Sequence, residues 1–560
     1  MKKVIIIILT LLVLALSCKE NTTNKDNLEV RVEKQHFDWA GANLYFLLTD
    51  RFNNGDTSND VNFDRTRETA KLRGFKGGDI KGITQKIKEG YFTELGINAI
   101  WMTPIVEQIH GGTDEGTGVT YGFHGYWTKD WTKIDPNFGT KADLHELVKE
   151  AHARGIRIVL DAVINHTGPV TEKDPVWPDS WVRTNDKCTF DSYENTVTCT
   201  LVENLPDIRT ESNEDVDLPP QLLQKWKDEG HYEQEVKELN TFFKRTGHPR
   251  APRFYIMKWL TDYITEFGID GYRVDTVKHT EEYVWQEFKV ECDYAFNQYK
   301  TNNPEKVLDD NAFYLVGEIY NYNISSGQYY DFGDKKVNYF DPPSFHSLIN
   351  FEFKWNSKEL SYEEQFKKYS DTLHGVLKGF GTLNYLSSHD DGSPFDAVRK
   401  KPYETANRLL LSPGTSQIYY GDESSRSLIV PGTEGDATLR STMNWDSIAK
   451  RKRTKAVLKH WQKLGQFRAH HPSVGAGTHH IISETPYAFY RNYTKGDVKD
   501  FVVVGLDLPK GKKVLDVSKV FENGDKIRDT YSGKFSKVSS GNVTIDSEYS
   551  ILLLEKVKPN

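Results

Sequence analysis

The chain has 560 residues, a length that corresponds to roughly three or four domains of ordinary size. Its 72 basic and 80 acidic residues give a formal net charge of −8, which argues against a nucleic-acid binder, because such proteins need cations to displace counterions from phosphates. Apolar residues make up 37% of the chain, enough for sizeable cores, and the 12% aromatic content suits either core packing or stacking on sugar rings.

Residues 1–18 predict an export signal. A basic start is followed by an apolar run over residues 4–16, which is shorter than the about 20 residues of a membrane span. Ser17 and Cys18 resemble a bacterial lipobox, so Cys18 is expected to be the lipidated first residue of the mature chain, although Ala15 stands where that pattern usually has Leu. The alternative is ordinary cleavage nearby and free secretion. Residues 19–35 are polar and predict a flexible tether.

Short apolar segments alternate with amphipathic helical segments along most of the chain. This alternation predicts a parallel sheet, and eight repeats predict a closed (β/α)₈ barrel over residues 36–164 and 251–473. The expected strands are residues 43–49, 99–103, 157–163, 271–274, 314–317, 348–351, 383–387 and 417–420. Helices are expected at residues 83–95, 141–153 and 255–267, and the last barrel helix at 456–468.

Two regions do not fit the barrel repeat. Residues 165–250 are too long for a connection between a strand and a helix, and they predict a loop-rich subdomain inserted after the third strand. Residues 474–560 contain alternating or continuous apolar segments without helical periodicity, so they predict a C-terminal antiparallel β-sandwich domain. Neither internal repeats nor low-complexity tracts interrupt this organisation.

Four cysteines occur in the chain, and no zinc-binding pattern joins them. Cys188 and Cys199 flank a turn-rich segment, and in an exported protein they are expected to close a small disulfide loop. Cys292 lies in a helical pattern and is expected to be a buried apolar residue.

Polar residues follow four of the predicted strands, at the end where catalytic groups of such barrels lie. Three of these residues are carboxylic acids on three different strands, so they are expected to meet at one mouth. Acids packed together resist joint ionisation; one can keep its proton as a donor while another stays charged as a nucleophile, as glycoside hydrolysis requires. In chain order the residues are Asp161, Asn165 and His166, then Arg273, Asp275, Lys278 and His279, then Glu318, and finally His389 and Asp390.

The segments 161–166, 271–279, 316–318 and 389–390 resemble, in the same order, the four signature regions of the α-amylase family, glycoside hydrolase family 13. Segments 90–101, 123–127 and 418–423 also resemble parts of that family, and the resemblance extends over residues 42–554. It implies that Asp275 is the nucleophile, Glu318 the general acid/base and Asp390 a third acid that grips sugar hydroxyls. For each carboxylate alone, an ordinary ion pair at a strand end is the competing interpretation.

The resemblance also implies substrate contacts around these acids. Arg273 would hold the nucleophile ionised, because its fixed fork suits a carboxylate. His124 would either touch the sugar or only support its loop. The other implied contacts are His166 and His389 to the same sugar, Tyr126 stacked beneath it, and Lys278 and His279 on the acceptor side, a pair typical of enzymes that cut α-1,4 links.

Calcium is the expected cofactor, at one or two sites. The loop with Asn54, Asp56, Asn59 and Asp60 is dense in the hard oxygen donors that Ca²⁺ prefers. It resembles a calcium loop of cyclodextrin glucanotransferases that Gly77 and Asp79 would complete; an acidic turn without metal is the alternative. The resemblance implies a second site formed by Asn165, Asp207 and the carbonyl of His279, although Ile208-Arg209 departs from the usual sequence after that Asp.

Within the family, an endo-acting α-amylase on α-glucans is the main interpretation. Glucosyl transfer is disfavoured, because Glu203 stands where cyclodextrin glucanotransferases have an aromatic residue, and those enzymes are expected to carry two further C-terminal domains. Cyclomaltodextrinases and neopullulanases usually add an N-terminal domain, whereas only a tether precedes residue 43 here. A non-catalytic glycan-binding surface lipoprotein is the remaining alternative, against which the three intact acids argue. The protein is expected to be a monomer at the cell envelope, on the outer membrane through its lipid and otherwise secreted.

Overall fold

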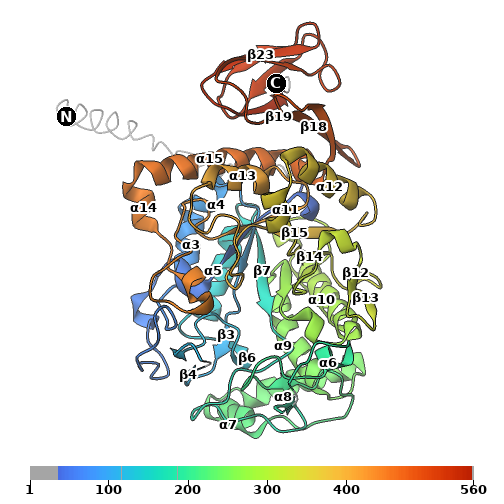
Figure 1. Cartoon of the computed structure of the whole chain (residues 1–560). Coiled ribbons are helices and arrows are strands. Elements are labelled where there is room, and N and C mark those ends of the chain that lie inside the picture. The colour runs from blue at the N-terminus through green and yellow to red at the C-terminus, as the bar shows by residue number, and fades with distance from the viewer. Residues whose placement is uncertain (1–35, 115, 186, 558–560) are drawn as a thin grey trace, which may run out of the picture. The chain divides into compact units, whose positions relative to one another are not determined.

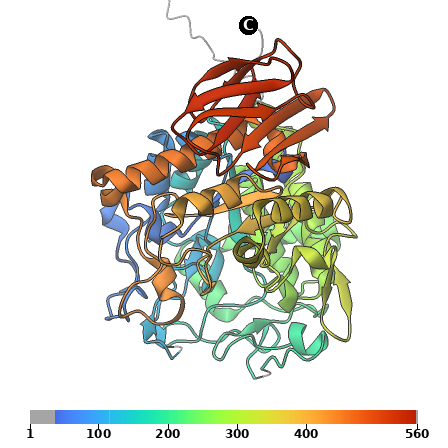
Figure 2. The same ribbon diagram turned by 45° about the horizontal axis from the view of Figure 1, so that its top comes forward.

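The computed structural model describes residues 36–114, 116–185 and 187–557, and it is shown in Figures 1 and 2. One compact unit begins at Phe37 and contains the barrel, the inserted subdomain and the C-terminal sheet. The predicted signal sequence, Cys18 and the tether at 19–35 lie outside the described residues. Among the helices of the described residues, none has the length and apolar character that a bilayer crossing requires.

Eight parallel strands close into the predicted barrel. Their order around the barrel is β1-β16-β15-β14-β11-β10-β7-β2, and every neighbouring pair runs parallel. Most strand residues are buried on both faces, as expected for strands that pack against side chains inside the barrel and helices outside it. The strands are β1 (Asn43–Leu47), β2 (Ala99–Met102), β7 (Arg157–Ala162), β10 (Gly271–Val274), β11 (Tyr314–Gly317), β14 (Ser347–Asn350), β15 (Gly381–Tyr385) and β16 (Thr415–Tyr419).

The helices surround this sheet, and one expectation about them is wrong. The single helix expected over residues 83–95 is two helices, because Gly90 adopts a left-handed conformation with φ 81° that interrupts the helix. The helices of the barrel are α2 (Thr49–Phe52), α3 (Ile80–Lys88), α4 (Tyr91–Glu94), α5 (Lys141–His152), α9 (Pro252–Phe267), α10 (Glu282–Asn302), α11 (Phe353–Glu359), α12 (Tyr362–His374), α13 (Pro402–Leu410), α14 (Trp445–Lys450), α15 (Lys452–His470) and α16 (Pro472–Ala476).

The inserted subdomain is more helical than expected. Its first half has the predicted irregular character, with β8 (Val182–Arg183), α6 (Glu194–Val197) and β9 (Asp207–Ile208). Its second half forms α7 (Pro220–Asp228) and α8 (Tyr232–Thr246), so the expectation of a loop-rich segment is wrong there. Leu222 and Trp226 on α7 and Phe242 and Phe243 on α8 are buried, which gives both helices an apolar face.

Short two-stranded ribbons accompany the barrel near the subdomain and near strand β11. The first ribbon pairs β3 (Val106–Gln108) with β6 (Thr128–Ile134), and the second pairs β4 (Thr113–Asp114) with β5 (Val119–Thr120). A third ribbon pairs β12 (Tyr329–Asp331) with β13 (Lys336–Asn338). The segment after β10 forms a 3₁₀ turn, η3 (Val277–His279), and this turn is part of the site described below.

The C-terminal region is the predicted antiparallel β domain. Figures 1 and 2 show it beyond α15, at the end of the barrel away from α7 and α8. It contains a six-stranded sheet and a two-stranded sheet around a separate apolar core. The strands are β17 (Thr478–Ser483), β18 (Ala488–Lys495), β19 (Val498–Gly505), β20 (Gly511–Asp516), β21 (Lys526–Asp529), β22 (Phe535–Lys537), β23 (Asn542–Ser547) and β24 (Leu552–Lys556).

A largely buried histidine, whose side chain is 12% exposed, joins the barrel to this sheet. His471 lies between two carboxylates, with Nδ1 2.9 Å from Asp500 and Nε2 2.8 Å from Glu555. Burial alone would lower the pKa of His471, but the hydrogen bonds to Asp500 and Glu555 outweigh burial and raise it to about 9. The imidazolium therefore stays charged at neutral pH and holds the end of the last barrel helix against β19 and β24.

Candidate active site

The predicted catalytic acids lie together at the carboxyl-terminal ends of the barrel strands. Asp275 directly follows β10, Glu318 directly follows β11, and Asp390 lies in the loop after β15. All three line one cavity of about 470 Å³. Adjacent parallel strands deliver Asp275 and Glu318 to the same edge of the barrel, so the convergence expected from the strand ends is present in the structure.

Arg273 connects the acids of this cavity. Its Nη1 atom lies 2.5 Å from Oδ1 of Asp275, and its Nη2 atom lies 3.4 Å from Oε2 of Glu318. Nη1 also lies 3.1 Å from Oδ1 of Asp161 on β7. Burial alone would lower the pKa of Arg273, but the surrounding acids, Asp161 first, outweigh burial and raise it. One permanently charged guanidinium therefore touches both acids to which the sequence assigns the chemical steps.

Asp161 is a member of the site to which the sequence analysis gave no role. It lies on a fully buried strand, and its Oδ2 atom accepts hydrogen bonds from Trp101 Nε1 at 3.0 Å and from the Tyr126 hydroxyl at 2.8 Å. Burial raises its pKa to about 7, although Arg273 opposes this shift. A carboxylate directly after the apolar run 158–160 of this strand was the available signal, because such a group must have buried partners.

Glu318 has the electrostatic environment of a proton donor. Burial is the main cause that raises its pKa to about 8, and the charges of Asp275 and Asp390 add to it. Arg273 and the backbone N–H of Thr276, which donates to Oε2 at 2.8 Å, oppose the shift without cancelling it. Near neutral pH, most molecules therefore carry a proton on Glu318, as a general acid requires.

The residues expected around the sugar form a compact group beside the acids. The Tyr126 ring stacks on the His389 ring with centroids 5.4 Å apart, and Nε2 of His166 lies 3.1 Å from the Tyr126 carbonyl. Burial lowers the pKa of His166, and it lowers that of His389 to about 4, so both imidazoles are neutral hydrogen-bonding groups. Nδ1 of His124 accepts from the backbone N–H of Tyr126 at 3.1 Å, a contact that supports the loop.

On the Glu318 side, the cavity has aromatic walls that the sequence analysis missed. Phe190 of the subdomain and Tyr320, two residues after Glu318, line it together with Lys278 and His279. Residues Phe190 and Tyr320 are 53% and 55% exposed, so each offers a face to a ligand. The position of Tyr320 beside the acid could have revealed it, whereas nothing in the sequence places Phe190 near the barrel.

Residues of the predicted calcium loop lie close together and carry oxygen donors of the type that calcium binds. Asn54 Nδ2 donates to Asp60 Oδ1 at 2.8 Å, and a Cβ added to Gly77 would lie about 2.5 Å from both side chains, so the three residues surround one small space. Oδ1 of Asn59 is buried and has no hydrogen-bond partner among the described residues. Amide, carboxylate and carbonyl oxygens of this kind are the donors that calcium takes.

Two residues expected to complete this site have other partners. The Asp79 carboxylate accepts from the backbone N–H groups of Gly55, Asp56 and Gly82, and it caps the start of α3. The Asp56 carboxylate accepts from Ser58 N at 3.0 Å and from Lys81 Nζ at 2.5 Å. Both carboxylates thus already have protein donors, whereas the buried Asn59 Oδ1 has none among the described residues.

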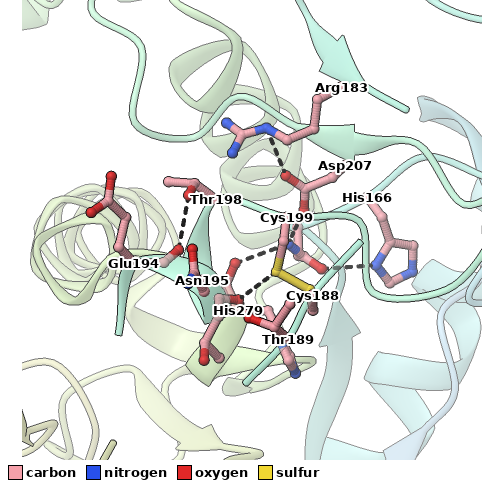
Figure 3. Close-up of a disulfide and its surroundings, with 12 residues drawn as sticks. His166, Arg183, Cys188, Thr189, Glu194, Asn195, Thr198, Cys199, Asp207 and His279 are labelled. Atoms are coloured by element: carbon pink, nitrogen blue, oxygen red, sulfur yellow. Dashed lines mark hydrogen bonds and ion pairs between the residues drawn. A yellow bond between two sulfur atoms is a disulfide. The ribbon is translucent and has the colours of Figure 1, made fainter. Parts of the chain in front are cut away.

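The second expected metal-binding set also comes together, between the barrel and the subdomain. Asn165 Nδ2 donates to Asp207 Oδ1 at 2.7 Å and to the His279 carbonyl at 3.1 Å. Arg183, which pairs with Asp207 across β8 and β9, places Nε 3.3 Å from the other carboxylate oxygen (Figure 3). A cation at this position would therefore share Asp207 with a guanidinium. No cluster of three or more His, Cys, Asp or Glu side chains suited to a metal occurs within the described ranges.

The predicted disulfide is present. Cys188 and Cys199 are bonded, with Cα atoms 4.9 Å apart, and Figure 3 shows their loop beside His279. Cys292 is a buried free cysteine, as expected.

Comparison with known proteins gives consistent matches over most of the chain. A family model described as the alpha amylase catalytic domain matches residues 46–450. The periplasmic α-amylase of Escherichia coli (strain K12) is 36% identical over 532 residues, which cover 83% of this chain and 72% of that protein. A cyclomaltodextrin glucanotransferase of Thermoanaerobacterium thermosulfurigenes is 25% identical over 91% of this chain and 65% of its own length.

Solved structures of α-amylases and glucanotransferases have the same fold as this chain. An Anoxybacillus α-amylase aligns with a TM-score of 0.63 and 24% identity, over 94% of this chain and 100% of that chain. A cyclomaltodextrin glucanotransferase described as having a three-domain ABC distribution aligns with a TM-score of 0.63 and 20% identity, over 92% of this chain and 99% of that chain. The second structure shows that a glucanotransferase can have this domain layout, so the expectation that such enzymes carry two further C-terminal domains is not general.

Proposed function

The chain belongs to the α-amylase family of glycoside hydrolases, and we propose that it is an endo-acting, retaining α-amylase that cleaves α-1,4-glucosidic bonds in starch, glycogen and malto-oligosaccharides. The observation that carries this proposal is the environment of the two central acids. Asp275 lies 2.5 Å from a buried guanidinium, whereas Glu318, on the neighbouring strand, has its pKa raised to about 8. An acid held by a guanidinium beside an acid that keeps its proton is the arrangement that double displacement needs.

Each residue of the site has a separate role in the proposed reaction. Asp275, held by Arg273, attacks the anomeric carbon while Glu318 gives its proton to the leaving oxygen. Glu318 then removes a proton from water, which releases the sugar from Asp275. Asp390 accepts hydrogen bonds from hydroxyls of the reacting ring, and Tyr126 stacks against that ring.

Cleavage inside a glucan needs room for sugar units beyond the acid. The cavity extends from Glu318 along Phe190 and Tyr320, and their exposed faces suit the apolar faces of glucose rings. Lys278 lies between them, with Nζ 5.2 Å from the Tyr320 ring and 5.9 Å from the Phe190 ring. This half of the cavity, which we call the leaving-group side, is defined by Phe190, Leu201, Lys278, His279 and Tyr320.

Glucosyl transfer is the second candidate activity. The aromatic leaving-group side would also hold a sugar acceptor, and glucanotransferases are among the relatives. Glu203 argues against cyclisation, because its side chain is 85% exposed and pairs with Lys187 rather than offering an aromatic face. Product analysis on a long glucan separates the two activities: cyclic products identify transfer, and linear oligosaccharides identify hydrolysis.

We expect the α configuration of the anomeric carbon to be retained. Two displacements restore the starting configuration, and retaining enzymes hold the two carboxyl groups about 5–5.5 Å apart, against about 6.5–9.5 Å in inverting enzymes. The contact of Arg273 with both Asp275 and Glu318 favours the shorter spacing. Proton NMR of the first product released from a malto-oligosaccharide tests this. Appearance of the β-anomer before mutarotation would show that Asp275 is not a nucleophile.

We also propose that Asn54, Asn59, Asp60 and Gly77 hold a calcium ion that stabilises the fold, and that the group at Asn165, Asp207 and His279 is a second candidate. An ion bound only by the folded chain adds about 2.7 kcal/mol to stability at a hundred times its dissociation constant. Exhaustive chelation should therefore lower the melting temperature by about 2.5 °C. Calcium should restore it.

Variants assign the chelation effect to the loop. Asp60→Ala and Asn59→Ala should lose most of the calcium-dependent shift, whereas Asp446→Asn, at a side chain that is 88% exposed, should keep it. An unchanged melting curve together with calcium-free metal analysis would remove the proposal.

Export is proposed from the N-terminal sequence and from the relative described as periplasmic. Lipidation of Cys18 is the finer part of this proposal. Mass spectrometry of the mature N-terminus distinguishes a diacylated Cys18 from an unmodified chain.

A further inference from the structure

The loop closed by Cys188 and Cys199 forms part of the leaving-group side. The two cysteines are 11 residues apart, and Phe190 lies between them in a left-handed conformation with φ 59°. The other end of the loop turns inward, because Thr196, Val197 and Cys199 are buried. One short loop therefore has an underside packed on the protein and an aromatic side chain exposed to the cavity.

The underside of this loop contacts the turn after β10. The Thr196 carbonyl lies 3.1 Å from Nδ1 of His279, and a carbonyl can only accept, so Nδ1 carries the proton. This hydrogen bond fixes the ring orientation and leaves Nε2 as an acceptor. The Phe190 ring lies edge-on to the same imidazole, with centroids 5.8 Å apart. The loop thus determines the positions of two groups, Phe190 and His279, that line the cavity beside Glu318.

Other contacts hold the middle of the loop. The backbone N–H of Tyr193 donates to Asp334 at 2.8 Å, and the Tyr193 hydroxyl donates to Glu282 at the start of α10. These contacts do not involve the cysteines, so we expect the loop to stay folded without the disulfide. Phe190 and Thr196 lie on either side of Tyr193, towards the two ends of the loop, where closure by the disulfide restricts the backbone most directly.

We propose that the Cys188–Cys199 disulfide is a positioning element for the leaving-group side: it holds Phe190 and Thr196 so that sugar units beyond Glu318 bind in register with the acid. This inference rests on the proposed function. It implies that full activity on long glucans needs the oxidised chain, a condition met after export and not in a reducing cytoplasm. Contacts to sugar units beyond the reacting bond contribute binding energy to substrate and transition state alike, so loosening them raises KM without changing kcat.

The test compares two substrates on the oxidised and disulfide-free proteins. Maltohexaose places sugars on both sides of the scissile bond, whereas an aryl α-maltotrioside places one aromatic ring on the leaving-group side. For Cys188→Ser/Cys199→Ser we expect about a tenfold rise in KM for maltohexaose, with kcat and the aryl substrate changed by less than about twofold. A purely structural role would lower kcat on both substrates together, in step with the melting temperature.

Reduction of the wild-type protein supplies a second measurement if the double variant folds poorly. Dithiothreitol gives two electrons and two protons to the disulfide, yielding two thiols and the cyclic oxidised reagent. Cys188 is half-buried rather than enclosed, which leaves the bond open to the reagent. The reductant should give the wild type the kinetics of the double variant and should leave the double variant unchanged. Unchanged maltohexaose KM after complete reduction would overturn the proposal.

A double-mutant cycle shows whether the disulfide acts through Phe190. Phe190→Ala should raise the maltohexaose KM in the disulfide-bonded protein and have little further effect in the Cys188→Ser/Cys199→Ser background, because the side chain is already misplaced there. If Phe190→Ala raised the maltohexaose KM by the same factor with and without the disulfide, the proposed positioning would be overturned. Absence of activity on both substrates in the wild type would instead refute the proposed function, so the two failures are distinguishable.

Discussion

Asp275→Asn is expected to lower kcat on malto-oligosaccharides by about 10⁴-fold or more, about 5.4 kcal/mol of lost transition-state stabilisation. An amide cannot form the glycosyl ester through which double displacement proceeds. It also lacks the negative charge that pairs with Arg273. The substitution nearly conserves shape, and Arg273 keeps its contact with Asp161, at 3.1 Å, so we expect the fold to survive.

Stopped assays with a chromogenic malto-oligosaccharide measure this loss, and thermal melting checks the fold. Asp446→Asn makes the same chemical change at an exposed side chain and should keep wild-type turnover. Turnover close to wild type in Asp275→Asn would exclude Asp275 as the nucleophile. The contact between Arg273 and that carboxylate would then be structural rather than catalytic.

Glu318→Gln is expected to reduce hydrolysis of malto-oligosaccharides by about 10³-fold, because the poor sugar leaving group then departs without a proton. Gln can still accept the hydrogen bond from Thr276 N, so the geometry of the turn should be kept. α-Maltosyl fluoride needs no protonation to leave. Its initial burst of fluoride release should stay within about tenfold of wild type.

The pH profile gives an independent check on Glu318. Burial raises its pKa to about 8, so the wild-type kcat/KM should fall as the pH rises through that value and the acid loses its proton. In Glu318→Gln, the residual kcat/KM on the same malto-oligosaccharide should lack this alkaline limb. An alkaline limb that persists unchanged in the variant would assign the proton donor to another residue.

These two variants test different atoms of one electrostatic unit. Arg273 is shared between Asp275, Glu318 and Asp161, so changing the side chain of Asp275 or Glu318 changes the environment of the other acid. We therefore expect the effects of the two substitutions not to add in the double variant, as for residues that act together.

The sequence alone was sufficient to predict the barrel and the meeting of Asp275, Glu318 and Asp390 in one cavity. Both follow from local patterns: apolar strands alternate with amphipathic helices, and each acid lies at the end of a strand or in the loop that follows it. Parallel strands of a barrel share one catalytic edge, so position along the chain was sufficient to place Asp275, Glu318 and Asp390 together. The prediction of a single helix at 83–95 is wrong because the left-handed conformation of Gly90 interrupts it. The prediction of irregular structure in the second half of the subdomain is wrong because the buried apolar faces of α7 and α8 stabilise two helices there.

Only the tertiary structure decided which groups tune these acids. Asp161 and Arg273 meet across 112 residues, and the pKa of Glu318 depends on its burial and on charges from other strands. The tertiary structure also decided the position of Phe190, which a disulfide loop of the subdomain brings to the cavity. It likewise showed that Asp79 caps α3. Such roles depend on distances between residues far apart in the chain, and packing fixes those distances after the local elements have formed.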